Sequence, residues 1–196
     1  MLSQALSGLT DILDNASIVP FRQPESSSML KNRFLTYSEI QLVQSIFADS
    51  IDCTNIKIYA VPFDWLKLNT AMSFGGRIYF PRRFFCDDFT QQNMAMKRWF
   101  VHEITHIWQS QNGFPVLFAG VLIFLSGGYF FQAAYRYQHK IKTHKTFAEL
   151  NMEQQAEVIA DFFTTNNPDE KNRLFFLLKD FITHRDWAKN LPKFFA

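Results

Sequence analysis

Apolar residues recur at three- and four-residue intervals along much of the chain, a spacing that places them on one face of an α-helix. This pattern predicts a short amphipathic helix at residues 3–13, and a loop follows at residues 20–28. Thr36 and Glu39 then have the spacing of a capping box, in which each side chain bonds the backbone N–H of the other. They predict the start of a helix with apolar residues at positions 40, 43 and 47.

Two short β-strands are predicted after this helix. Residues 56–61 alternate in polarity and are rich in β-branched side chains, and Pro62 ends the pattern. The glycine pair at residues 75–76 introduces a second strand at residues 77–80, which Pro81 stops.

Helical patterns dominate the second half of the chain. They predict helices over residues 90–111 and 146–163, with Thr90 and Thr146 as N-caps, and a last helix that starts at residues 167–168. A few short strands followed by several helices indicate the α+β class. We expect a mostly helical domain with a small sheet before its central helix.

Length and composition indicate one globular domain. The 196 residues suit a single large core, and we divide them into an N-terminal helix and loop at 1–35 and one domain at 36–196. Phe occurs 23 times and aromatic residues make up 17% of the chain, which excludes wholesale disorder. A formal net charge of +2 gives no indication of a nucleic-acid partner.

The cysteines and the N-terminus bear on the cellular compartment. Cys53 and Cys86 could form one disulfide or remain two separate thiols, and the sequence leaves both open. Residues 1–18 have no basic n-region, and Asp11 and Asp14 interrupt their apolar character. We therefore expect synthesis in the cytoplasm without a cleavable signal.

The residues that carry chemistry lie on the central predicted helix. His102 and His106 are four residues apart, so they lie one turn apart on one face and can bind one zinc ion. Glu103 lies beside them, where its carboxylate can polarise a water at an open zinc position. This His-Glu-x-x-His pattern predicts a zinc hydrolase.

The predicted helix at residues 146–163 offers the third ligand. Two His and one Glu form a known catalytic zinc set that leaves the fourth position open. We expect Glu157 to be that ligand, because Asp161 lies one turn later and could hold the non-ligating ring nitrogen of His102. Glu153, one turn earlier on the same face, is the alternative ligand.

Residues 114–131 contain no charged residue and reach the lower limit for a membrane span. A single crossing would put His106 and Glu157 on opposite sides of the bilayer, which is incompatible with a shared metal. We favour a buried helix between the ligands, ended by the glycines at 127–128. The alternatives are a membrane-dipping or hydrophobic partner surface, and a span without a metal site.

Together, these residues resemble the gluzincin group of zinc metallopeptidases, which matches at His102, Glu103, His106, Glu157 and Asp161. In that group the two His and the later Glu bind zinc. The Glu of the first motif is general base and acid, and the Asp supports a zinc-bound His. The resemblance therefore implies a zincin-like fold, a zinc cofactor and peptidase activity.

A narrower resemblance concerns residues 100–109 and 150–157, which are similar to compact Vgr-related or Rhs-associated bacterial zincins found beside contractile secretion systems. It extends over about residues 36–163. It implies a secreted effector, a secretion-system component as partner, and export by that system. Zincins also place an edge strand above the metal, where a substrate peptide pairs in extended form. Residues 77–80 fit that place, with an ordinary sheet strand as the alternative.

In the expected mechanism, Glu103 and zinc activate a water that attacks a carbonyl, and Glu103 then delivers a proton to the leaving amine. The oxyanion needs a further donor besides zinc. No spacing rule selects this donor, and we name Tyr137 from the following candidates: Tyr135, Tyr137, His139, His144 and His184.

Three functions remain open at this point. The first is a zinc endopeptidase that acts on a protein or on a peptidoglycan peptide. The second is a non-catalytic, zinc-stabilised adaptor or carrier module of a secretion apparatus, with residues 114–131 as its docking surface. The third is a membrane peptidase, for which the insert between the ligands is too short to cross and return.

Overall fold

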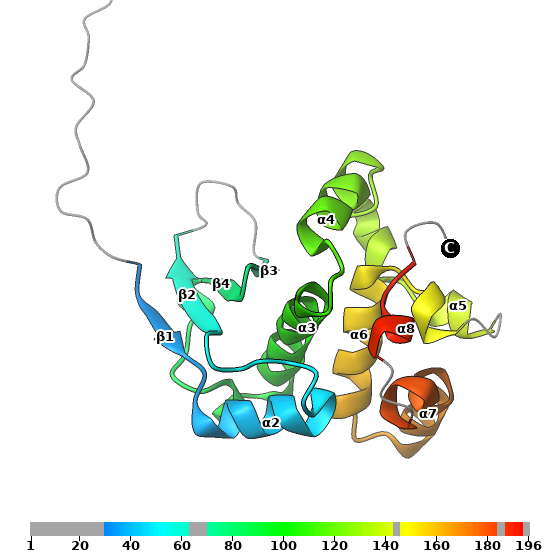
Figure 1. The fold of residues 1–196 in the computed structure, drawn as a ribbon, viewed down its shortest axis with the longest axis horizontal. Coiled ribbons are helices and arrows are strands. Elements are labelled where there is room, and N and C mark those ends of the chain that lie inside the picture. The colour runs from blue at the N-terminus through cyan, green and yellow to red at the C-terminus, as the bar shows by residue number, and fades with distance from the viewer. Residues whose placement is uncertain (1–29, 63–69, 143–145, 184–186, 194–196) are drawn as a thin grey trace, which may run out of the picture.

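The structure is a computed structural model that describes residues 30–62, 70–142, 146–183 and 187–193 (Figure 1). The helix predicted at 3–13 and the loop predicted at 20–28 lie outside these residues.

Four short strands form one mixed sheet in the order β1-β2-β4-β3. β2 and β4 are parallel, whereas β1 pairs with β2 and β3 with β4 in antiparallel fashion. The two predicted strands are confirmed as β2 and β4, and the glycine pair before β4 adopts the positive φ of 58° and 73° that a tight turn requires. The strands are β1 (Asn32–Phe34), β2 (Lys57–Val61), β3 (Met72–Phe74) and β4 (Arg77–Pro81).

The helices follow the sheet in the sequence, except for α2. α3 runs through the middle of the molecule, with the sheet on one side and α6 on the other (Figure 1). The α+β class, mostly helical with a small sheet before the central helix, is confirmed. The helices are α2 (Tyr37–Phe47), α3 (Met94–Gln111), α4 (Val116–Leu125), α5 (Gln138–Lys142), α6 (Met152–Thr164), α7 (Pro168–Thr183) and α8 (Trp187–Asn190).

The predicted capping box of α2 is present. Oγ1 of Thr36 accepts from the backbone N–H of Glu39 at 3.2 Å, and Glu39 accepts from the backbone N–H of Thr36 at 2.9 Å. Pro168 opens α7 as predicted, although α8 follows it.

Two other predicted N-caps are wrong. α3 starts from Asn93, whereas Thr90 lies in a separate 3₁₀ turn. Thr146 does form a capping box, but with a 3₁₀ turn, and α6 starts from a second capping box at Asn151 and Gln154. Cap-forming residues stand close together before both helices, so local sequence does not decide which one continues into a long helix.

The main core surrounds the indole of Trp108 on α3. Its ring stacks on Phe47 of α2 at 5.6 Å and meets Phe181 of α7 edge-on at 5.4 Å. Its Nε1 donates to the hydroxyl of Ser50 at 3.0 Å. The abundant aromatic residues therefore join helices from both ends of the described chain, which fixes α3 as the central element.

Cys53 and Cys86, whose pairing the sequence leaves open, are free thiols. Burial raises the pKa of each thiol. Both are therefore poor nucleophiles, in keeping with partly buried packing residues.

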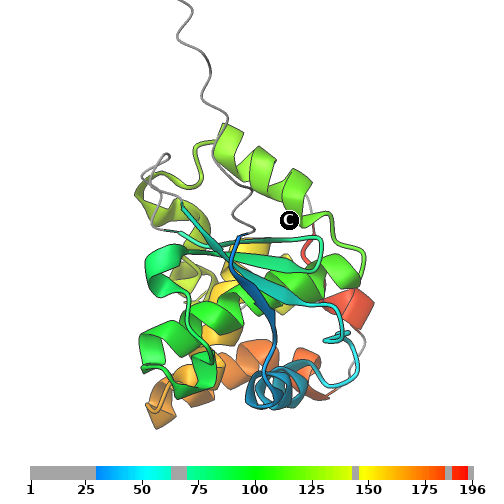
Figure 2. The ribbon, with the colours of Figure 1, turned by 90° about the vertical axis from the view of Figure 1, so that its left-hand side faces the viewer.

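The segment predicted to form a buried helix is mostly exposed. α4 lies at the top of Figure 2; it buries Val116 and Ala119 and half-buries Ile123, while its other large side chains are exposed. A helix that is apolar on all faces can bury only the face that has a neighbour. Within the described residues, α4 packs into the core through the face that carries Val116 and Ala119. Among the described residues, no helix is long and apolar enough to cross a membrane.

A buried carboxylate joins the first strand, α2 and the turn before α3. Glu39 is fully buried, and its two oxygens accept from the guanidinium of Arg33 at 2.7 and 2.8 Å. The backbone N–H of Phe89 donates to the same carboxylate at 2.8 Å. Such a pair is costly to break, because removal of one partner leaves the other charge without compensation.

We therefore expect Glu39→Gln to lower the free energy of unfolding by about 3 kcal/mol. The exposed Gln41 lies on the same helix, and Gln41→Ala should change stability by less than ~0.5 kcal/mol. Urea unfolding followed by circular dichroism measures both. Equal midpoints for the two variants would show that the buried network does not stabilise the fold.

Candidate metal centre

Three ligand atoms from two helices meet in the protein interior. Nε2 of His102 and Nε2 of His106, one turn apart on α3, lie 3.1 Å from each other. Oε2 of Glu153, in the first turn of α6, lies 3.2 Å from the former and 3.3 Å from the latter. All three residues are buried.

The spacing of these atoms fits a small tetrahedral cation. Zinc–ligand bonds of ~2.0 Å at tetrahedral angles separate the ligand atoms by about 3.3 Å, which is close to the three distances observed. The ligand set of two imidazoles and one carboxylate is also one that zinc accepts. The residues present therefore fit the metal that the sequence predicts.

The carboxylate that meets the two imidazoles is that of Glu153, the residue named as the alternative, rather than that of Glu157. Glu157 lies one turn further along α6, and its Oε1 is 2.9 Å from Nδ1 of His102, on the side of the ring away from the other ligand atoms. This Nδ1 makes no well-aligned hydrogen bond among the described residues, so the contact is an ion-pair distance rather than a directed bond. The predicted arrangement of a ligand followed by a supporting carboxylate is therefore present one turn earlier on α6, with Glu153 in the place expected for Glu157 and Glu157 in the place expected for Asp161.

Asp161, predicted to support His102, has a different position. It accepts from Nε of Arg98 at 2.5 Å and from the hydroxyl of Tyr137 at 2.5 Å. Arg98 also bonds Glu157. Burial alone would lower the pKa of Arg98, but the carboxylates of Asp161 and Glu157 outweigh it and raise that pKa. Asp161 thus acts on His102 only through Arg98 and Glu157.

Gln109 fixes the ring of His106, a role that the sequence reading missed. Its Oε1 lies 2.9 Å from Nδ1 of His106, while its Nε2 donates to the backbone oxygen of Met152 and to Oε1 of Gln155. Because the amide oxygen can only accept, the imidazole proton belongs on Nδ1. The lone pair of Nε2 is therefore free to bind a cation.

Three tyrosines follow α4 in the sequence, and their hydroxyls differ in their hydrogen-bond partners. Tyr129 donates to Oε1 of Glu153 at 2.8 Å, and Tyr137, the predicted catalytic residue, is buried and bonded to Asp161. The ring of Tyr135 lies 6.1 Å from that of His102, and its hydroxyl has no hydrogen bond within the described ranges. Burial and the charges of Glu153, Glu103 and Glu157 raise the pKa of Tyr135, so its phenol is close enough to interact with these carboxylates.

The other candidate donors are not part of this cluster. His139 is exposed on α5, and His144 and His184 lie outside the described residues.

Negative charge prevails around the two imidazoles. Burial alone would lower the pKa of His102, but Glu153 and Glu157 outweigh it and raise that pKa to about 10. The pKa of His106 is raised in the same way, against burial, chiefly by Glu153. A site that favours positive charge on its own ligands is suited to a divalent cation.

Glu103 is buried beside the ligand atoms, and its Oε2 accepts from the hydroxyl of Ser73 at 2.6 Å. Ser73 lies on β3, which is the edge strand of the described sheet, whereas β4 lies between β2 and β3. The edge position expected for residues 77–80 is therefore wrong, because the three-residue strand before them takes it. No motif marks Ser73 in the sequence.

The fold that holds this site is shared with a bacterial effector domain. The solved structure of the effector domain of Pseudomonas aeruginosa VgrG2b superposes with a TM-score of 0.61 over 91% of this chain and 96% of that chain, at 24% sequence identity. The type VI secretion system spike protein VgrG2b of the same organism is 29% identical over 161 residues. That alignment covers 77% of this chain but 15% of the spike protein, and no family model matches the chain.

This similarity confirms the secretion-associated, Vgr-related part of the expected resemblance. The gluzincin assignment and the peptidase activity stay predictions.

The two glutamates of α6 provide a matched test of the ligand assignment. Glu157→Gln should retain one zinc per chain at saturation and weaken the zinc affinity by ~10–100-fold, the effect of losing support for a ligand. Glu153→Gln should weaken it by more, because it removes a ligand itself. Titration with zinc against a competing chelator measures both, and a larger loss in Glu157→Gln would restore Glu157 as the third ligand.

Proposed function

We propose that this chain is a zinc-dependent peptide hydrolase that acts as an effector domain of a type VI secretion system. The observation that carries the proposal is the buried set of three ligand atoms with Glu103 beside it. A structural zinc site is closed by four protein ligands, whereas the described residues offer three, which leaves a position for water. A glutamate in this position has a role in hydrolysis and none in holding a structural metal.

A zinc ion held by His102, His106 and Glu153 would polarise the substrate carbonyl and lower the pKa of a bound water. Glu103 accepts the proton of the attacking water and delivers it to the leaving amine. Ser73 donates to one oxygen of Glu103 and thereby leaves the other oxygen for this proton transfer.

Tyr135 is our candidate for the oxyanion donor, in place of Tyr137. The hydroxyl of Tyr137 donates a hydrogen bond to Asp161 and that of Tyr129 donates one to Glu153, so both hydroxyls are already engaged. Tyr135 lies beside His102 with an uncommitted hydroxyl in the described structure. Its raised pKa keeps the phenol protonated, as a hydrogen-bond donor must be.

The substrate we propose is an extended peptide, in a protein or in a peptidoglycan crosslink. β3 is the edge strand of the described sheet, and its outer side can pair with such a chain through backbone hydrogen bonds. Ser73 is on this strand and contacts Glu103, so a peptide paired here lies next to the general base.

The effector role rests on the similarity to VgrG2b and to its effector domain. We propose that the chain is made in the cytoplasm, is exported by the secretion system, and has a component of that system as its partner.

Two substitutions separate metal binding from hydrolysis. Glu103→Gln should keep one zinc per chain and lower the rate of peptide hydrolysis by roughly 10²–10⁴-fold, because it removes the general base. His106→Ala should lose both zinc and activity. The measurements are zinc content by mass spectrometry and cleavage of denatured protein and peptidoglycan substrates. A wild-type protein that binds zinc but hydrolyses neither substrate would favour the non-catalytic adaptor.

The oxyanion role of Tyr135 has its own test. Tyr135→Phe should lower kcat by about 10²–10³-fold with little change in KM or zinc content, since the hydroxyl acts in the transition state. Tyr59→Phe removes a hydroxyl from β2, away from the ligand atoms, and should leave kcat unchanged. Equal kcat values for wild type and Tyr135→Phe would exclude this residue.

A further inference from the structure

An apolar helix projects from the molecule next to the metal centre. α4 extends beyond the sheet and the other helices in both views (Figures 1 and 2). Leu125 is 74% exposed and Leu117 is 66% exposed, values that are high for residues of this size. The exposed side chains of α4 are Leu117, Phe118, Val121, Leu122, Phe124 and Leu125.

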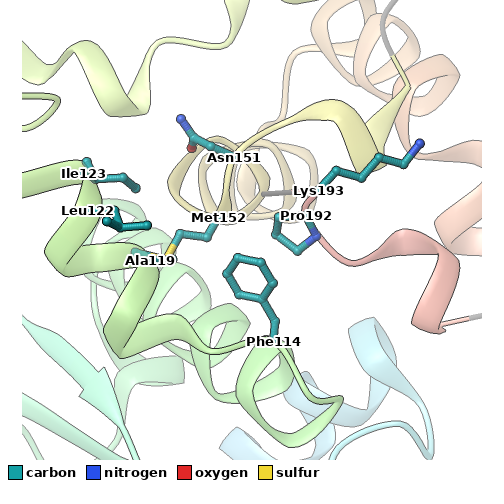
Figure 3. Close-up of a pocket in the computed structure, with 8 residues that line it drawn as sticks. All are labelled: Phe114, Ala119, Leu122, Ile123, Asn151, Met152, Pro192 and Lys193. Carbon is teal, nitrogen blue, oxygen red and sulfur yellow. The ribbon is translucent and has the colours of Figure 1, made fainter. Parts of the chain in front are cut away.

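One face of α4 packs against the rest of the protein, so the position of its exposed face is fixed. Ala119 and Val116 pack with Phe114 and Met152 in a small second core. A pocket of about 100 Å³ beside this core is lined by α4, the start of α6 and Lys193 (Figure 3). At the far end the chain turns back so tightly that a Cβ on Gly128 would lie 2.8 Å from the side chain of Ile123.

The first charged residues that follow α4 in the sequence are all basic. No acidic residue occurs between Glu103 and Glu149, and the charged residues in this interval are all basic and follow α4. Arg136, on the segment after α4, is exposed, and so is Lys193, which lines the pocket beside α4. The segment therefore combines an apolar projection with basic flanks, a combination that complements an anionic lipid surface.

The shape of α4 also suits a membrane interface. Its six exposed apolar side chains lie on one broad face, opposite the buried Val116 and Ala119, and an interfacial helix lies in the membrane surface with one such face inserted. At ten residues the helix is about 15 Å long, half of what a span requires, so it can enter one leaflet only. We propose that α4 inserts into the interface of a membrane that contains anionic phospholipid. This proposal is independent of the peptidase activity.

Vesicle flotation with the full chain tests the proposal. The wild type should bind vesicles of phosphatidylglycerol and phosphatidylcholine more tightly than vesicles of phosphatidylcholine alone. The double variant Phe118→Ser/Leu125→Ser should lower the partition coefficient by at least about tenfold, because two large apolar side chains no longer enter the interface. Arg136→Gln should lower binding to the anionic vesicles by about fivefold and leave binding to phosphatidylcholine unchanged.

Phe176→Ser is the matched control, because Phe176 is equally exposed at 74% but lies on α7. It should bind like the wild type, and thermal unfolding should show that all variants are folded. Failure of the wild type to float with anionic vesicles would overturn the proposal. So would an equal loss in Phe176→Ser, or a dimer in solution that Phe118→Ser/Leu125→Ser abolishes, since α4 would then bind a second copy.

Discussion

The register between α3 and α6 is the constraint on which the site depends. Gln109 joins the two helices through Met152 and Gln155, while Arg98 joins them through Asp161 and Glu157. The three ligand atoms lie between these two connections. A slip of one turn between the helices would replace Glu153 by a neighbour and separate the ligand set. Burial of so much negative charge is unfavourable without a cation, so a metal ion held between the helices would stabilise their packing.

The sequence predicts the part of the site that lies on one helix. A spacing of four fixes His102 and His106 on one face whatever the rest of the chain does. It cannot choose between Glu153 and Glu157, since both occupy the same face of α6 and the choice depends on how α6 crosses α3. Ser73 could not be predicted, because it reaches the site from a short strand that has no motif. Tyr135 was one of five candidate donors and could not be singled out, because no spacing rule marks the 3₁₀ turn on which it lies.

The fold, like the site, has features that sequence neighbours determine and features that only tertiary packing determines. The capping box at Thr36 and the strand before Pro62 are set by neighbours in the sequence, and both were predicted. The start of α6 depends on which of two adjacent capping boxes continues into a helix packed on α3. The composition of α4 likewise does not predict that the helix is exposed, since a uniformly apolar segment has no pattern that distinguishes core from surface.

The bond from Tyr129 to Glu153 has a consequence for coordination number. One oxygen of this carboxylate faces the imidazoles, and the other is engaged by the phenol at 2.8 Å. A metal ion held at this site would meet one oxygen of Glu153, because the other oxygen already accepts from the phenol. A Cβ on Gly120 of α4 would lie 3.5 Å from the same hydroxyl, so this surface helix borders the phenol that holds Glu153.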